Sequence, residues 1–427
     1  MVVAIKLHAS ESARGELKIL VASTLGTLTE CYDFFLYGSL ASVLSKEFFA
    51  GLAEQTKFIF ALLAFVVGFA FRPLGALIFG RLGDTRGRKS TFVVTLVLME
   101  CATFGVDLLP GYQQWGSAAP TLLILLRVLQ SIGLGGEFGG AAIFVAEHTP
   151  PERRGANTSW IQAAGALGMI FALLVVYACR AVFGSVFDRW AWRIPFLLSG
   201  VMLSISLYVR LLISESPLFL KMKAEGRTSR KPIAETFGSW ANVKIILIAL
   251  FGLITGVTTV IYTAQIYALF FLSHILRVDG GTAGLYVAIA LTAAIPPFWV
   301  FGSLSDRIGR KPVILTGCLL GALTYFPAFH AITHYANPAL ETTVAVSPVT
   351  VYANNSGCSF QYTALSFPYH VGNGLVGGFF PAISFAIVSQ TEDIYAGLRY
   401  PVGFSFATAI VGFLFLKRKL LSSEVTA

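Results

Sequence analysis

Long apolar runs alternate with short polar segments along the whole chain. Each run holds about 20 residues or more, which as a helix is enough to cross ~30 Å of hydrocarbon. The runs are continuous and do not alternate residue by residue, so the pattern excludes a membrane β-barrel. It predicts helical spans at 19–44, 58–80, 90–109, 120–146, 156–181, 192–213, 243–273, 282–303, 312–333, 366–390 and 396–416.

Composition supports the same class of protein. Of 427 residues, 56% are hydrophobic and 12% are charged, whereas a soluble domain carries about 25% charged residues. With the N-terminus in the cytoplasm, most Lys and Arg fall in cytoplasmic tails and loops, in keeping with the positive-inside rule. This bias explains the net charge of +9 without a nucleic-acid partner. We therefore expect a multi-pass protein of a bacterial inner (plasma) membrane.

The chain divides into two halves with a repeated loop. Six spans precede a polar segment, which predicts an N-terminal bundle at 1–213, a cytoplasmic linker at 214–242 and a C-terminal bundle at 243–427. The loop GRLGDTRGRK (80–89) follows the second span of the first half, and GSLSDRIGRK (302–311) follows the second span of the second half. Both carry Gly, Leu, Asp and a final Gly-Arg-Lys at the same places. Such a repeat indicates a transporter with two halves related by an axis along the membrane normal.

These paired loops resemble the signature loop of the major facilitator superfamily. The stretches TECYDFFLYG, FRPLGALIFGRLGD, RVLQSIGLGGEFGGA, AEHTPPERRG, ESPLF and LSFPYHVGNGLVGGFFP further resemble its metabolite:proton symporter branch. The resemblance implies an all-α fold of two pseudo-symmetric bundles that transports by alternating access. It also implies gating loops, in which the first acid pairs with basic residues and with the N-terminal dipole of a helix from the other half. The alternative is that the loops only fix topology. The residues concerned are Gly80, Asp84, Gly87, Arg88, Gly302, Asp306, Arg307, Gly309 and Arg310.

The first span contains two acids near its centre. Glu30 and Asp33 are three residues apart and share a helix face, and Tyr37 follows on the same stripe. An ionised carboxylate facing lipid is costly, so this stripe is expected to face the interior of the bundle or a water-filled cavity. Burial raises the pKa of a carboxyl group, which lets such an acid hold a proton near neutral pH. Glu30 and Asp33 are therefore candidates for proton coupling, and the alternative is a structural partner of an Arg within the membrane.

The fourth span supplies Arg127, Gln130 and Glu137. Gln130 and Tyr37 are candidates for the polar lining of a substrate cavity. Arg127 is a candidate cavity cation for a substrate carboxylate, with snorkelling to the outer interface or a fixed pair with Asp33 as alternatives. Glu137 lies among glycines suited to close helix contact and is expected to be a structural acid, with a proton carrier as the alternative. Arg72, within the second span, is likewise expected to pair structurally.

The resemblance to the superfamily implies that the seventh span also lines the central cavity. Tyr262 and Gln265 lie on its polar stripe and are candidate hydrogen-bonding partners of a polar substrate, with ordinary contacts between helices as the alternative. His370 and Asn373 open the penultimate span. A histidine titrates in a useful range, although a single one at a helix start is more often structural.

The chain departs from its family in the second half. Members have twelve spans and eleven are predicted here, because the polar stretch after 312–333 leads directly into 366–390. The family's tenth span is expected to be missing, with an extracytoplasmic loop at 334–365. Eleven spans would put the C-terminus outside, whereas the basic residues 417–419 favour the cytoplasm.

No catalytic, metal-binding or ATP-binding motif occurs, so we expect a transporter and not an enzyme, driven by a proton gradient without a cofactor. The expected function is proton symport of a small organic acid, such as a dicarboxylate, a tricarboxylate or a shikimate-like compound. Two alternatives remain: proton symport of zwitterionic osmolytes such as proline or betaine, and a shortened relative that does not transport. The expected partners are the small-molecule substrate, the proton and the lipid bilayer, and the protein is expected to be a monomer.

Overall fold

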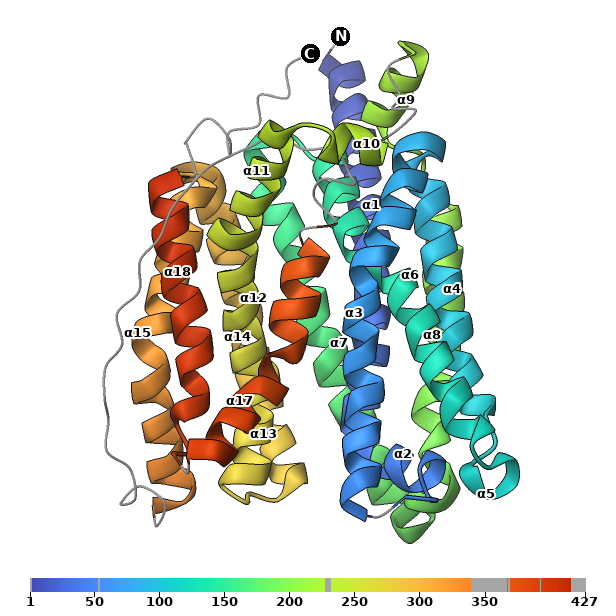
Figure 1. Cartoon of the computed structure of the whole chain (residues 1–427). Helices are drawn as coiled ribbons and strands as arrows, with labels where there is room; N and C mark the ends of the chain where they lie inside the picture. Colours follow the sequence, from blue (N-terminus) through green and yellow to red (C-terminus); the bar gives the residue numbers. More distant parts are fainter. Residues whose placement is uncertain are drawn as a thin grey trace. The chain divides into compact units, whose positions relative to one another are not determined.

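The computed structural model describes residues 2–52, 54–226, 232–338, 367, 369–391 and 393–415. Helices make up almost all of this part of the chain (Figure 1). Those of the first half are α1 Val2–Ser39, α2 Ala41–Phe48, α3 Glu54–Arg86, α4 Arg88–Leu108, α5 Tyr112–Trp115, α6 Ala118–His148, η1 Pro151–Arg153, α7 Arg154–Phe183, η2 Gly184–Val186, η3 Phe187–Ala191, α8 Arg193–Leu211, α9 Pro217–Ala224 and α10 Pro232–Phe237. Those of the second half are α11 Trp240–Ala249, η4 Leu250–Ile254, α12 Thr255–Tyr262, η5 Thr263–Tyr267, α13 Ala268–Phe270, η6 Phe271–Ile275, α14 Gly280–Ile308, α15 Arg310–Ala336, η8 Val371–Gly377, α17 Gly378–Thr391, η9 Ala396–Leu398 and α18 Arg399–Phe415.

Nine helices in the described part of the chain are long and apolar enough to cross a membrane. Two further expected spans, 58–80 and 366–390, fall on α3 and on the shorter helical stretch formed by η8 and α17. The total of eleven spans therefore stays a prediction. The first span is shorter than expected, because α1 ends at Ser39 and α2 begins at Ala41. The adjoining Gly38 and Ser39 are poorer helix formers than the apolar residues around them.

The residues form two compact units. The first comprises 1–232 together with 292–306, and the second comprises 233–291 together with 307–427. The chain passes from the first unit to the second between Pro232 and Ile233, within the segment predicted as a linker.

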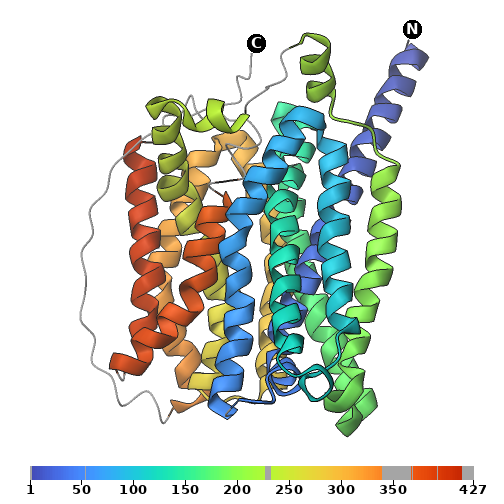
Figure 2. The same ribbon diagram turned by 45° about the vertical axis from the view of Figure 1, so that its right-hand side comes forward.

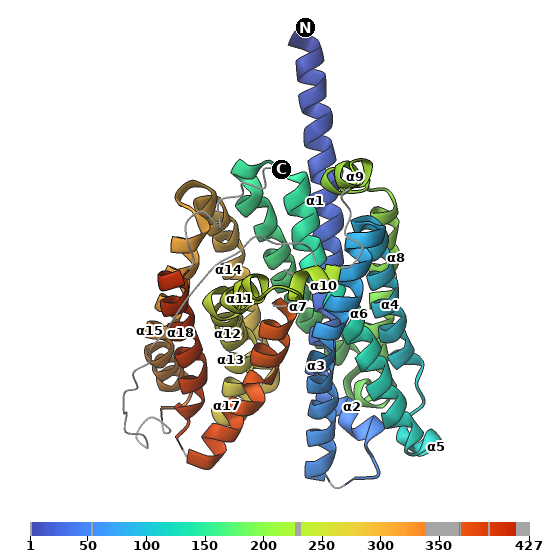
Figure 3. The same cartoon turned by 45° about the horizontal axis from the view of Figure 1, so that its top comes forward.

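In the first unit, α6 packs between α3 and α4, while α1 packs against α7, α8 and α6 (Figures 1 and 2). Glycines let these helices approach closely, as predicted for the fourth span. A methyl group at Gly133 would meet the carbonyl oxygen of Thr95 at 3.0 Å, and one at Gly136 would meet the Phe79 ring atom Cγ at 2.8 Å. The N-terminal end of α1 projects beyond the other helices of this unit (Figure 3).

In the second unit, the helical run from Trp240 to Ile275 continues through 36 residues, which corresponds to about 54 Å. Helix α18 packs against α12 and α15. Lys311, at the start of α15, donates through Nζ to the carbonyl oxygen of Phe413, near the end of α18, at 2.9 Å. The two helices are therefore antiparallel.

Helices α15 and α17 run in the same direction. At one end of the 240–275 run, Asn337 donates through Nδ2 to the carbonyl oxygen of Leu276 at 3.3 Å. Near the other end, the rings of Phe237 and Phe367 pack with centroids 5.2 Å apart. The chain therefore leaves α15 at one end of the unit and enters η8 and α17 from the opposite end. The expected loop at 334–365 lies mostly outside the described residues, and so do the basic residues 417–419.

Candidate functional site

A buried ion pair links α6 to α8 in the first unit. Arg210 donates to both carboxylate oxygens of Glu137, and neither side chain is exposed. Thr95 donates to the same carboxylate at 3.0 Å, and Arg210 also donates to the carbonyl oxygen of Phe92 at 2.9 Å. The guanidinium occupies the space that a side chain at Gly26 would take. This geometry is consistent with the expected structural role of Glu137.

Glu30 lies on α1 beside this ion pair. It is buried and interacts electrostatically with Glu137, Arg72 and Arg210. The guanidinium of Arg72 lies over the rings of Phe34 and Phe69, at 4.7 and 4.2 Å from their centroids. Arg72 therefore joins α3 to α1 by cation–π contacts, consistent with a structural role.

Arg127 lies on α6 ten residues before Glu137, which places it nearly three turns closer to the start of that helix. Its guanidinium stands 3.9 Å from the centroid of the Tyr37 ring and donates to Oε1 of Gln130. Gln130 in turn donates to the hydroxyl of Thr103 on α4 at 2.7 Å. The structure thus brings three of the predicted site residues together. Arg127 is 4% exposed, so its charge lies inside the bundle, which excludes snorkelling.

Asp33 faces a second acid that the sequence reasoning missed. Its carboxylate lies within interaction range of Glu100, Thr103, Ser199 and Arg127. Asp33 and Glu100 are each 1% exposed. Glu100 was visible as an acid within the predicted span 90–109, but only the packing of α4 against its neighbours shows that it faces the stripe on α1.

The first repeated loop is held by its own Asp84 and by two acids from elsewhere in the first unit, Glu147 and Glu215. Arg88 donates to Asp84 at 2.7 Å and lies 3.6 Å from Glu147. The backbone N–H groups of Arg88 and Lys89 donate to Oε1 of Glu215, which caps the start of α4.

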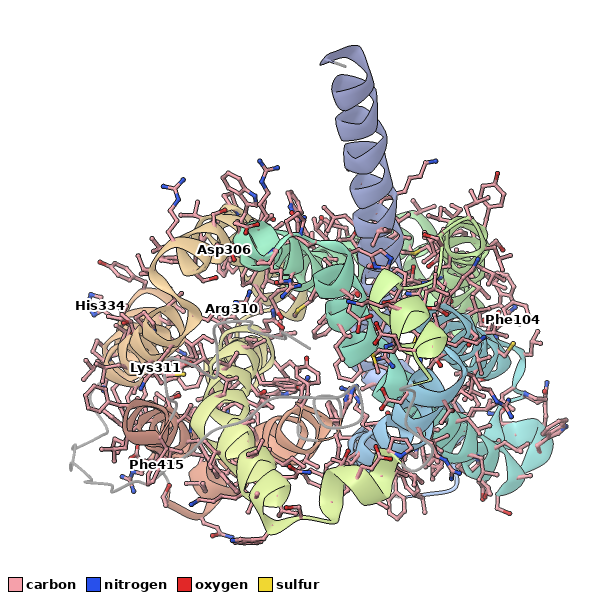
Figure 4. All side chains as sticks on the ribbon, turned by 90° about the horizontal axis from the view of Figure 1, so that it is seen from above. Phe104, Asp306, Arg310, Lys311, His334 and Phe415 are labelled. Atoms are coloured by element: carbon pink, nitrogen blue, oxygen red, sulfur yellow. The ribbon has the colours of Figure 1, made fainter. Side chains whose placement is uncertain are left out.

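The second loop shows the helix-dipole contact expected of such an acid. Asp306, at the end of α14, accepts from the backbone N–H of Gly155 at 2.7 Å and of Ala156 at 2.9 Å. These N–H groups open α7, so the carboxylate meets the positive end of its dipole. Figure 4 shows Asp306 beside this helix. A methyl group at Gly302 would meet the carbonyl oxygen of Gly155 at 2.7 Å, so glycine is required for this approach.

The two loops also share a backbone device. Gly87 has φ +119° and Gly309 has φ +92°, where a side chain is strained. Each residue lies immediately before the helix that follows its loop, α4 or α15. The other predicted loop residues, Gly80, Arg307 and Arg310, lie on α3, α14 and α15.

The remaining predicted site residues belong to the second unit. Tyr262 and Gln265 are buried, and a methyl group at Gly377 of η8 would meet the Tyr262 ring at 3.2 Å. Asn373 donates to the hydroxyl of Tyr369 at 2.8 Å. His370 is buried, with its ring 5.0 Å from that of Tyr369. The structure therefore pairs Asn373 and His370 with Tyr369, and it shows Tyr262 facing η8.

Buried charges inside a bundle of membrane-spanning helices, together with repeated loops at the ends of those helices, define a membrane transporter. Comparison with known proteins agrees. Residues 18–244 match the family described as "Sugar (and other) transporter". The chain belongs to this family, within the major facilitator superfamily, whose members are transporters and not enzymes.

Named relatives cover most of the chain. It is 30% identical to the proline/betaine transporter of Escherichia coli (strain K12) over 420 residues, 93% of this chain and 82% of that protein. It is 32% identical to the shikimate transporter of the same organism over 390 residues, 86% and 87% of the two chains. It is 28% identical to the citrate-proton symporter of Klebsiella pneumoniae over 419 residues, 95% and 92%. The crystal structure of a D-xylose-proton symporter matches with a TM-score of 0.65 at 17% identity, covering 94% and 98%, which shows the fold.

Proposed function

We propose that this protein is a proton-coupled symporter of a small organic acid that works by alternating access. The observation that carries the proposal is the position of Arg127, a buried cation held by an aromatic ring and an amide in the interior of the first unit. A desolvated guanidinium pairs strongly with a carboxylate and can do so through two parallel hydrogen bonds. The shikimate and citrate relatives carry substrates of that kind by name.

Proton coupling is supported by the neighbourhood of that cation. Asp33 lies within interaction range of Arg127, so its charge competes with a substrate carboxylate for the guanidinium. Protonation of Asp33 removes this competition and favours substrate binding. The loop contacts are the proposed gate, since Asp306 and the start of α7 form an interaction that one conformation makes and another breaks.

The test is uptake by the full chain in proteoliposomes with an imposed proton gradient. The substrates are citrate, a dicarboxylate, shikimate, proline and betaine. We expect an organic acid to accumulate, with Arg127→Lys raising its KM about tenfold or more, because the planar fork is lost. Arg180→Gln, which changes an exposed arginine on α7, is the matched control and should leave KM unchanged. An unchanged KM in Arg127→Lys would contradict the role of this residue.

The acids around Arg127 favour a second candidate. A zwitterion such as proline or betaine could place its carboxylate on Arg127 and its cationic group near Asp33 or Glu100. The proline/betaine relative at 30% identity supports this alternative. Accumulation of proline or betaine in the same assay, without accumulation of the acids, would favour it over the first proposal.

The directions of α15 and α17 support a third candidate, the shortened relative that does not transport. The residues between these helices are polar, yet the chain has to connect opposite ends of the second unit. Absence of uptake of all five compounds by protein that remains monodisperse would support this reading, and uptake of any one would exclude it.

A further inference from the structure

Among the residues that the structure describes, the interior of the first unit holds one more acid than it holds bases. Seven charged side chains of this described part are buried between the repeated loop and the opposite ends of the helices. They are Glu30, Asp33, Arg72, Glu100, Arg127, Glu137 and Arg210. Four are acids and three are arginines, so the fully ionised set has a net charge of −1. Burying a net charge in a medium of low dielectric is costly, and binding one proton would neutralise this set.

Two of the four acids lie beside arginines, although Oε2 of Glu30 accepts no hydrogen bond from the described residues. Glu137 accepts from Arg210 and from Thr95. Glu30 interacts with Arg72 and Arg210, and it also lies near Glu137. These two acids and two arginines balance one another, which leaves Asp33 and Glu100 with the single charge of Arg127.

The carboxylates of Asp33 and Glu100 face each other without a donor. Neither oxygen of either group accepts a hydrogen bond from the described residues. The hydroxyls of Thr103 and Ser199 lie close to Asp33. Thr103 donates to the carbonyl oxygen of Met99 at 3.1 Å and Ser199 donates to that of Phe196 at 2.5 Å. Two ionised carboxylates are acceptors only, so their contact needs a proton to become a hydrogen bond.

We propose that Asp33 and Glu100 share one proton and together form the proton-binding site of the transporter. The proposal deepens the proposed function and rests on it for the coupling to substrate. Binding one proton changes the pair from two negative charges to one and brings the buried set to neutrality. The proton lies between an oxygen of each acid, as in other carboxylate pairs that cannot both ionise. Release of that proton to water restores both carboxylates.

Four helices around the pair contribute charged or titratable groups to this environment. Helix α1 supplies Glu30 and Tyr32, α3 supplies Arg72, α6 supplies Arg127 and Glu137, and α8 supplies Arg210. Arg127 interacts with Asp33, and Arg210 interacts with Glu100. The shared proton weakens the attraction between the pair and Arg127, which frees the guanidinium for an anion. The pair therefore links the proton to the substrate through this arginine.

The experiment measures the proton itself and needs no substrate. The full chain is reconstituted in lipid, and infrared difference spectra of the carboxyl groups are recorded across a pH series. Wild type should show one protonated carboxyl that ionises in a single step. In Glu100→Gln and in Asp33→Asn the remaining acid should ionise at least about one pH unit lower, because the neighbouring negative charge is gone. The double variant should lose the signal.

Asp107→Asn is the matched control, because it changes an acid on the same helix α4, seven residues from Glu100, and should leave the transition in place. Glu100→Asp keeps a carboxyl group and tests the pair if Glu100→Gln does not fold. An unchanged Asp33 transition in folded Glu100→Gln protein would overturn the proposal. If Asp33 and Glu100 ionise as a pair but the protein takes up none of the five compounds, the proposed function is overturned and the proposed pair stands. Proton-coupled uptake by protein in which Asp33 and Glu100 ionise independently would overturn the proposed pair and leave the proposed function intact.

Discussion

Lys311 Nζ donates to the carbonyl oxygen of Phe413 at 2.9 Å, and this contact repeats one made in the first half by Lys89 and Leu211 at 3.0 Å. The two lysines end the repeated loops, and the two carbonyls lie near the end of the last helix of each half. The lysines are 222 residues apart, whereas the carbonyls are 202 apart. The second half is therefore 20 residues shorter between these points, about the length of one membrane-spanning helix.

The space at Gly26 gives a prediction about stability. Gly26→Ala would place a methyl group where the Arg210 guanidinium lies. Displacing this guanidinium breaks a buried ion pair, which costs about 3–5 kcal/mol. We expect a clearly lower unfolding temperature, measured by loss of the monodisperse fraction on heating the purified protein. Gly38→Ala, on the same helix with nothing within 4 Å of the added methyl, should change it little. Equal behaviour of the two variants would contradict this account.

The contact between Asp306 and α7 predicts a change in gating. Asp306→Asn keeps the size of the side chain and removes its charge, so the cap on Gly155 and Ala156 should weaken by about 1.5 kcal/mol or more. A cysteine at Ser305, which packs against Gly155, should then react about tenfold faster with a maleimide.

The control for this experiment is Asp279→Asn. Asp279 caps the start of α14 through Gly281 and Thr282, at the opposite end of that helix from Asp306. The same cysteine should keep its wild-type rate in this variant. A rate unaffected by Asp306→Asn would show that the cap does not hold the gate.

The contact between the Tyr37 ring and Arg127 predicts that two substitutions of Tyr37 raise the KM by different amounts. Tyr37→Phe keeps the aromatic face over Arg127, whereas Tyr37→Leu removes it. A desolvated cation–π contact contributes about 2 kcal/mol, so the Leu variant should raise the KM of a carboxylate substrate severalfold more than the Phe variant. If the Phe variant were impaired as much as the Leu variant, the hydroxyl and not the ring would be the important group.

The directions of α15 and α17 predict the sidedness of single cysteines in a cysteine-free background. Tyr335, at the end of α15, and Trp240, at the start of α11, are both exposed and lie at opposite ends of the second unit. An impermeant maleimide should label a cysteine at 335 in intact cells and a cysteine at 240 only after permeabilisation. A cysteine at Leu414 should behave like the one at 240. Labelling of 335 and 240 from the same side would contradict the observed arrangement.

Sequence alone predicted the positions of the helices well, because a continuous apolar run of this length can satisfy its backbone hydrogen bonds in a membrane only as a helix. It also identified Glu30, Asp33 and Arg127 as residues in need of an explanation, since intramembrane charges are rare. It could not pair them. Glu137 and Arg210 are 73 residues apart, and periodicity along one helix says nothing about the neighbour it faces. Glu100 was missed for the same reason, because its significance depends on a carboxylate contributed by another helix.

The opposed ends of α15 and α17 also define a place where the protein can be redesigned. A helix of about 20 apolar residues inserted between Ala336 and Phe367 would cross in the direction the chain already needs. Neither α17 nor α18 would have to be reversed, and the contact between Lys311 and Phe413 could stay as it is. The same scaffold could then be compared with and without the added helix.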